Sequence, residues 1–183
     1  MAKVLVPLAQ GCEELEAVTI IDLLRRAGIE VVTAGLDAET VVASRGVKLQ
    51  PDTSLDSALQ QEFDMVVLPG GLPGAENLEQ DSRITELLKR MSANNKYTAA
   101  ICAAPVVLAR TGLLNHKKAT GYPGILAKLD LPDTQLLDEA VVIDGKVVTS
   151  RGPGTTMDFA LSLIEILAGK DKRNTVESAL VRS

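Results

Sequence analysis

The chain has 183 residues, 46% of them hydrophobic, which is enough for one domain with a large core. Only 2% are aromatic and the net charge is −5, so we expect an aliphatic core and no specific nucleic-acid partner. Two cysteines make no disulfide framework or metal pattern, and the apolar run at the N-terminus is too short for a signal peptide or membrane span. We therefore expect a cytoplasmic protein, with no membrane partner, in which Cys12 and Cys102 are thiols.

Short apolar runs alternate with longer stretches of helical periodicity. The runs predict strands over 3–9, 30–35, 64–70, 97–102 and 146–150. The periodic stretches predict helices over 13–27, 82–94, 103–112 and 155–168. An additional hairpin is expected over 40–50. This alternation favours one doubly wound α/β domain, residues 1–183, with a parallel sheet buried on both faces.

Glycines and a capping pattern mark the helix ends. Thr155 with Asp158 resembles a capping box, and Gly28, Gly112 and Gly169 are placed to end helices. Ligands of such sheets bind outside the carboxyl ends of the strands. The loops at these ends are expected over 9–14, 70–76, 102–105 and 150–155.

Cys102 lies where the strand in "AAICAAP" ends and a helix is predicted to begin. Small neighbours permit a sharp turn, like a nucleophile elbow with alanines in place of glycines. Unpaired N–H groups at the start of the helix would lower the pKa of the thiol and favour the nucleophilic thiolate. The alternative is that Cys102 is a small buried hydrophobic residue.

Glu16 falls within the apolar arc of the predicted helix 13–27, beside Ala17 and Ile20. Burial there would raise the pKa of its carboxyl, which could then donate a proton to a thiolate or act as an acid/base. The alternative is a glutamate near a helix start that bends towards water.

Two glycine-containing loops complete the candidate site. Gly70 and Gly71 follow a strand, so their backbone can approach a ligand and their N–H groups could form an oxyanion hole. In "SRGPGT", Arg151 could hold a carboxylate or close a subunit interface, or the turn could only connect. His116, the lone histidine, lies in a polar turn remote from these loops, which disfavours a Cys-His protease.

Four segments, "GCEELEAV", "VLPGG", "AAICAAP" and "TSRGPGT", together resemble the ThiJ/PfpI superfamily. The resemblance is closest to the branch that contains the parkinsonism-associated deglycase and its bacterial homologues. It implies a flavodoxin-like three-layer α/β sandwich with a mostly parallel sheet. It also implies a homodimer with active sites near the interface, and no cofactor or metal.

The same resemblance assigns roles to residues. Cys102 matches the reactive, easily oxidised cysteine and Glu16 its protonated partner. Gly71 and Ala103 match the backbone N–H donors that face the sulfur. Arg45 matches an arginine near the neighbouring subunit's site.

Two positions lie outside this pattern. Human-like members carry a histidine before a proline near the site, whereas this chain has Tyr122 before Pro123; Tyr122 could still hydrogen-bond a substrate. Cys12 could approach Cys102 as a resolving thiol or be a bystander.

The resemblance predicts a glyoxalase or protein deglycase acting on 2-oxoaldehydes (methylglyoxal, glyoxal) or their early adducts, in defence against carbonyl and oxidative stress. A second hypothesis is a redox-sensing chaperone for unfolded client proteins, in which oxidised Cys102 is the signal. A third is a ligand-binding α/β domain with an inert cysteine. The two leading hypotheses share one site, so sequence reasoning does not separate them.

Overall fold

The computed structural model describes residues 1–37 and 39–182. Its main sheet has seven strands in the order β10-β11-β7-β6-β1-β2-β5. All neighbouring pairs are parallel except β10 with β11. The strands are β1 (Lys3–Leu8), β2 (Glu30–Gly35), β5 (Thr53–Ser54), β6 (Met65–Leu68), β7 (Tyr97–Ile101), β10 (Val141–Asp144) and β11 (Val147–Ser150). The five longer parallel strands follow the flavodoxin-like order, in which the chain reverses direction across the sheet between β1 and β6.

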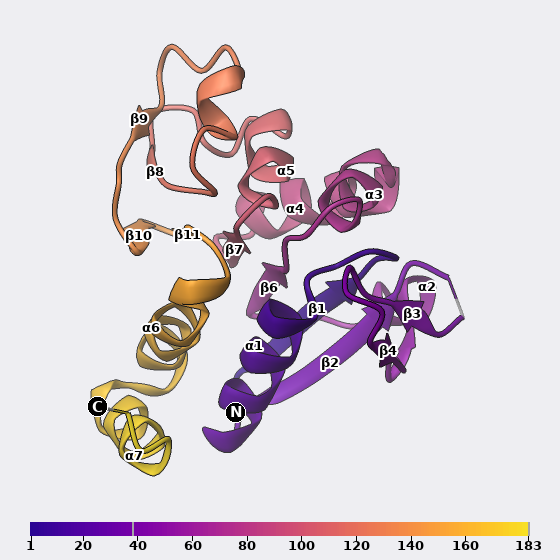
Figure 1. Cartoon of the computed structure of the whole chain (residues 1–183), viewed down its shortest axis with the longest axis vertical. Coiled ribbons are helices and arrows are strands. Elements are labelled where there is room, and N and C mark those ends of the chain that lie inside the picture. The colour runs from indigo at the N-terminus through magenta and orange to yellow at the C-terminus, as the bar shows by residue number, and fades with distance from the viewer. Residues whose placement is uncertain (38, 183) are drawn as a thin grey trace.

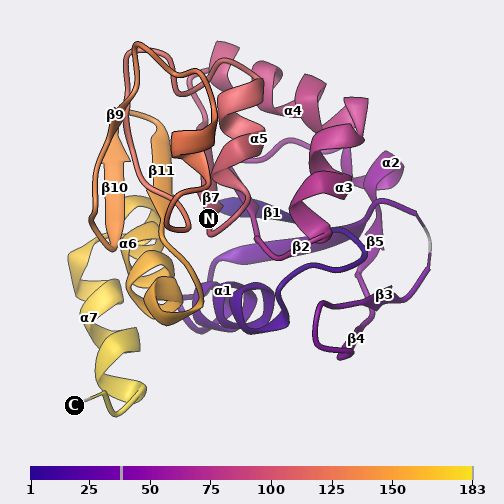
Figure 2. The ribbon, with the colours of Figure 1, turned by 45° about the horizontal axis from the view of Figure 1, so that its top comes forward.

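Successive residues of the central strands pack into two separate cores, one on each face of the sheet. In β1, Val4 and Val6 face one core and Leu5 the other, as the two-residue period of a strand requires. The first core is covered by α1 (Glu14–Arg26), α6 (Thr156–Ala168) and α7 (Lys170–Ala179), and the second by α3 (Gly74–Gln80), α4 (Ser82–Ala93) and α5 (Pro105–Arg110). Figure 2 shows these two helical layers on opposite sides of the sheet. The three-layer sandwich is confirmed.

Several short elements complete the structure around these layers (Figure 1). An antiparallel hairpin, β3 (Val41–Val42) and β4 (Lys48–Leu49), confirms the extra hairpin. The others are α2 (Leu55–Ala58), the parallel pair β8 (Lys118–Ala119) and β9 (Gln135–Leu136), and two 3₁₀ turns, Leu126–Lys128 and Pro153–Thr155. Among the described residues, no helix is both long and apolar enough to span a bilayer.

The predicted strands and helices are all present, with bounds that shift by one or two residues. Two expectations are wrong. The loop 70–76 already contains the start of α3. Thr155 does not cap α6, because its hydroxyl hydrogen-bonds with the backbone of Gly152 and the hydroxyl of Ser150. Thr155 therefore stabilises the turn before α6 instead of capping the N-terminus of α6.

Candidate active site

The turn after β7 holds Cys102 in a left-handed backbone conformation, with φ of 64°. A non-glycine residue in this region carries about 1–3 kcal/mol of strain, which the surroundings must offset. Two hydrogen bonds do so here: the N–H of Cys102 donates to the carbonyl of Ser150 at 3.0 Å, and its carbonyl accepts from the N–H of Tyr122 at 2.8 Å. The predicted sharp turn is confirmed, and its backbone is tied to two other loops.

Glu16 lies on the inner face of α1, with none of its surface exposed to solvent. The N–H of Gly70 donates to its Oε2 at 2.8 Å. Its other oxygen, Oε1, is buried and has no hydrogen-bond partner among the described residues. Burial raises the pKa of this carboxyl to about 7, although the hydrogen bonds from Gly70 and Cys102 oppose the shift. The raised pKa expected from the apolar arc is confirmed.

Gly70 lies at the point where the glutamate and the cysteine meet. A Cβ on Gly70 would be 2.6 Å from Cβ of Cys102 and 2.9 Å from Oε2 of Glu16. No side chain fits in that space. The missing side chain thus lets a residue from α1 and a residue from the turn after β7 approach each other at the end of β6.

The expectation of a lowered thiol pKa is wrong. Burial raises the pKa of the Cys102 thiol to about 12, and the negative charge of Glu16 raises it further. The main-chain N–H groups of Gly71 and Ala103 hydrogen-bond the sulfur and lower the pKa, but by less. With the pKa of Glu16 near 7 and that of the thiol near 12, the pair binds one proton between these values and titrates as a unit.

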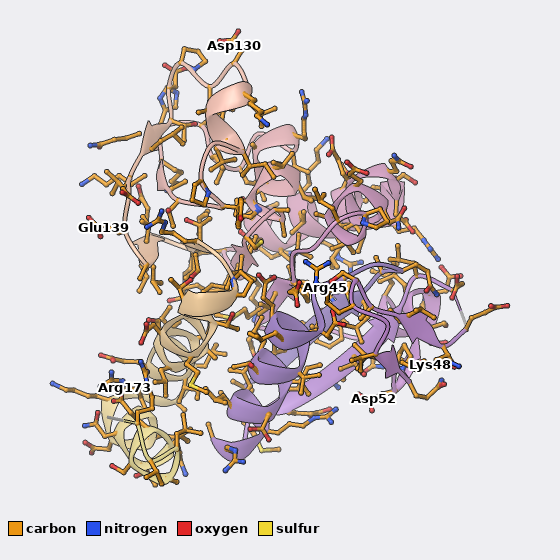
Figure 3. All side chains as sticks on the ribbon, viewed as in Figure 1. Arg45, Lys48, Asp52, Asp130, Glu139 and Arg173 are labelled. Atoms are coloured by element: carbon orange, nitrogen blue, oxygen red, sulfur yellow. The ribbon has the colours of Figure 1, made fainter. Side chains whose placement is uncertain are left out.

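The structure places the other candidate residues at different distances from this pair. Tyr122 is half-exposed, and its main-chain N–H donates a hydrogen bond to the carbonyl of Cys102. Arg45 lies beside the N-terminal end of α1 (Figure 3), where its N–H donates to Glu14 at 2.8 Å rather than to Cys102 or Glu16. Cys102, Glu16, Gly70, Gly71 and Ala103 therefore form one cluster, with Tyr122 at its edge and Arg45 outside it.

The main-chain hydrogen bonds of Cys12 and His116 join them to residues outside this cluster. Cys12 is fully buried, and burial raises the pKa of its thiol to about 12. His116 is exposed in the turn before β8, where its N–H donates to the carbonyl of Asp133.

Sequence reasoning missed two residues next to the site. The hydroxyl of Ser150 donates to the carbonyl of Ala140 at 2.6 Å and lies 2.7 Å from the hydroxyl of Thr155, which stabilises the "SRGPGT" turn. Asp138 forms an ion pair with Arg151 at 2.8 Å. The position of Ser150 directly before the glycine-rich turn could have indicated that its hydroxyl stabilises this turn. Nothing in the sequence around Asp138 indicated that it pairs with Arg151.

The profile of the DJ-1/PfpI family matches residues 2–166. The chain belongs to the DJ-1/PfpI family. The ThiJ/PfpI resemblance found in the sequence is thereby confirmed.

Curated relatives and solved structures agree with this assignment. Protein DJ-1 homolog A of Arabidopsis thaliana is 44% identical over 180 residues, which cover 97% of this chain and 46% of that protein. The chain thus spans less than half the length of this relative and of Arabidopsis homolog B. The glutathione-independent glyoxalase DJR-1.2 of Caenorhabditis elegans is 35% identical over 175 residues, covering 96% of this chain and 92% of that protein.

The crystal structure of Drosophila melanogaster DJ-1beta superposes with a TM-score of 0.95 at 44% identity, covering 100% of this chain and 98% of that one. A structure of Toxoplasma gondii DJ-1, described as oxidized, has a TM-score of 0.94 at 40% identity and covers 100% of both chains. The single-domain α/β fold with a mostly parallel sheet is therefore shared with DJ-1 proteins.

Proposed function

We propose that this protein is a cysteine-dependent, cofactor-independent glyoxalase or deglycase. Its substrates would be 2-oxoaldehydes such as methylglyoxal and glyoxal, or their early adducts. The observation that carries the proposal is the buried carboxyl of Glu16, one oxygen of which has no hydrogen-bond partner in the described part of the chain, against the side chain of the strained residue Cys102. The similarity to a relative named as a glutathione-independent glyoxalase supports the same chemistry.

The first step is the addition of the Cys102 sulfur to the aldehyde carbon. The pair of Cys102 and Glu16 supplies one proton near neutral pH. When this proton is on Glu16, the sulfur is a thiolate and forms the S–C bond, while the aldehyde oxygen takes the proton and a hemithioacetal results. The N–H groups of Gly71 and Ala103, which hydrogen-bond the sulfur, lie where they can stabilise negative charge developing beside it.

The second step is an internal oxidation and reduction of the bound substrate. The Glu16 carboxylate removes the hydrogen of the former aldehyde carbon as a proton, giving an enediolate. Glu16 then returns this proton to the neighbouring carbon, while the hydroxyl proton of the former aldehyde carbon moves to the neighbouring oxygen. The aldehyde carbon is thereby oxidised to a thioester and the ketone carbon reduced to an alcohol. Water then cleaves the C–S bond, so that methylglyoxal and water yield lactate and the free thiol returns.

Lactate formation from methylglyoxal by the purified protein, without glutathione, tests the proposal. We expect turnover by the wild type and its loss in Cys102→Ser. Activity of Cys102→Ser equal to that of the wild type would contradict it.

The second candidate function is a redox-sensing chaperone in which oxidised Cys102 is the signal. The oxidized structure of the Toxoplasma relative favours it, as does a sulfur that accepts two main-chain hydrogen bonds. Mass spectrometry after mild peroxide should show two added oxygens on Cys102, accompanied by suppressed aggregation of a client protein. Aldehyde turnover at catalytic rates would favour the first function instead.

We also propose that the protein acts as a homodimer. Leu15 and Val18 on α1 and Met157 on the neighbouring α6 are exposed apolar residues. Light scattering should report a dimer for the wild type and a monomer for Val18→Glu. Ile143→Glu, at an exposed apolar residue of β10, is the control and should remain a dimer.

A further inference from the structure

A cavity of about 330 Å³ adjoins the Cys102 turn. A second hollow, of about 200 Å³, shares Tyr122, Pro123 and Arg151 with it. The first cavity combines apolar walls with two charged side chains, those of Asp138 and Arg151. Its lining otherwise consists of Thr120, Gly121, Gly124, Leu126, Ala127, Leu136 and Leu137.

Sheet register places this cavity directly beside the reactive turn. Ser150 of β11 pairs with Ile101 of β7, so Arg151 follows β11 at the level where Cys102 follows β7. The N–H of Cys102 also donates to the carbonyl of Ser150 at 3.0 Å, so Cys102 and Arg151 lie on adjacent segments. On the other side, the backbone of Tyr122 donates to the carbonyl of Cys102. A ligand in the cavity is therefore next to the main chain of the turn that carries Cys102.

The two charges of the cavity differ in how firmly they are held. Nη1 of Arg151 lies 2.8 Å from Oδ1 of Asp138, but the arginine side chain is 36% exposed and the aspartate side chain 83%. An ion pair this exposed contributes only about 0–1 kcal/mol. Breaking this ion pair therefore costs little free energy, and it frees the guanidinium of Arg151, the less exposed of the two side chains, for another carboxylate.

We propose that this cavity binds the carboxylate end of an acidic 2-oxoaldehyde, with Arg151 holding the carboxylate in place of Asp138. The guanidinium can bind a carboxylate through two parallel hydrogen bonds. Leu126 and Leu136 provide apolar surface for a short methylene chain between the carboxylate and the aldehyde. This inference rests on the proposed function, because it names the substrate class of the same site.

Binding of 4-oxopentanoate, which has the chain and carboxylate but no aldehyde, tests the cavity without turnover. Calorimetry would use the Cys102→Ser protein as background. We expect Arg151→Gln to weaken binding at least about tenfold, as for loss of a charge-assisted contact. Asp138→Asn should tighten binding because it removes the competing carboxylate, and Arg151→Lys should restore part of the affinity. Affinity unchanged within twofold in Arg151→Gln, with its melting temperature retained, would overturn the proposal.

Turnover separates this proposal from the proposed function. In the otherwise native protein, Arg151→Gln should lower kcat/KM for 4,5-dioxopentanoate at least about ten times more than for neutral methylglyoxal, chiefly through KM. Equal losses for both aldehydes would overturn the substrate assignment and leave the glyoxalase proposal intact. No turnover of either aldehyde by the wild type, with 4-oxopentanoate binding that depends on Arg151, would overturn the glyoxalase proposal and support the carboxylate site.

Discussion

The main-chain N–H of Gly70 donates to Oε2 of Glu16 at 2.8 Å and joins the end of β6 to the inner face of α1. The same glycine leaves room for the side chain of Cys102. One residue without a side chain thus orients the carboxyl and admits the thiol.

Gly70→Ala should separate the pair. The new methyl group would lie within 3 Å of both Cβ of Cys102 and Oε2 of Glu16, so one of them must move. We expect a loss of about 1–3 kcal/mol in the free energy of unfolding and a strong loss of aldehyde turnover. Gly154→Ala is the stability control, because no described residue lies within 4 Å of the position that its methyl group would take and its φ is not positive. Equal free energies of unfolding of the two variants in urea would show that a methyl group at residue 70 does not clash with Cys102 or Glu16.

Glu16→Gln should abolish the acid/base step while the fold survives. The amide has nearly the shape of the carboxyl but does not accept and return a proton at neutral pH, and such steps contribute about 10²–10⁴-fold to rate. We expect lactate formation to fall by about that factor. Glu86→Gln, on the exposed side of α4, should retain wild-type kinetics. Full turnover by Glu16→Gln would remove this residue from the mechanism.

Stability should depend on pH through Glu16. Between its ordinary pKa of 4.5 and the raised value of about 7, the unfolded chain has lost the proton that the folded protein keeps. The free energy of unfolding therefore falls as the pH rises through this range, by about 3 kcal/mol. Glu16→Gln lacks this contribution.

The measurement is the difference between wild-type and Glu16→Gln unfolding free energies at pH 4, 5.5 and 7.5. Contributions from other carboxyls, such as those of Asp52 and Asp64, are common to both proteins and cancel. A difference that stays constant with pH would show that the carboxyl has an ordinary pKa.

Alkylation by iodoacetamide should report the raised pKa of Cys102. In the wild type, the rate should rise with a midpoint above the ordinary thiol value of 9.0, because burial and the Glu16 charge both oppose ionisation. In Glu16→Gln the midpoint should move down, because the charge is gone and burial remains. Cys102→Ser corrects for reaction at Cys12. A wild-type midpoint below 8 would contradict the raised thiol pKa, and it would show that Glu16 holds the proton that the pair shares.

Local patterns were sufficient for the main elements and for two site residues. The apolar runs of β1, β2, β6, β7 and β11 indicate buried parallel strands regardless of their partners. The position of Glu16 in the apolar arc of α1 predicted its burial and its raised pKa, because helical periodicity places it there. Small residues around Cys102 likewise indicated a sharp turn. The polar helix α7, in which Val176 is buried, and the short strands β8, β9 and β10 were not predicted.

The chemical environment of Cys102 was decided only by the tertiary structure. The sequence around Cys102 suggests free N–H groups at the start of a helix, which would lower the pKa of the thiol. That pKa also depends on the residues from other segments that pack against the sulfur. Burial and the charge of Glu16, which comes from α1, reverse the direction of the shift, and Gly70 at the end of β6 leaves the room in which the two side chains meet. The pairing of Arg151 with Asp138 has the same origin. Periodicity reports which face of an element is buried, whereas a pKa or an ion pair depends on distances between segments that only the packed chain brings together.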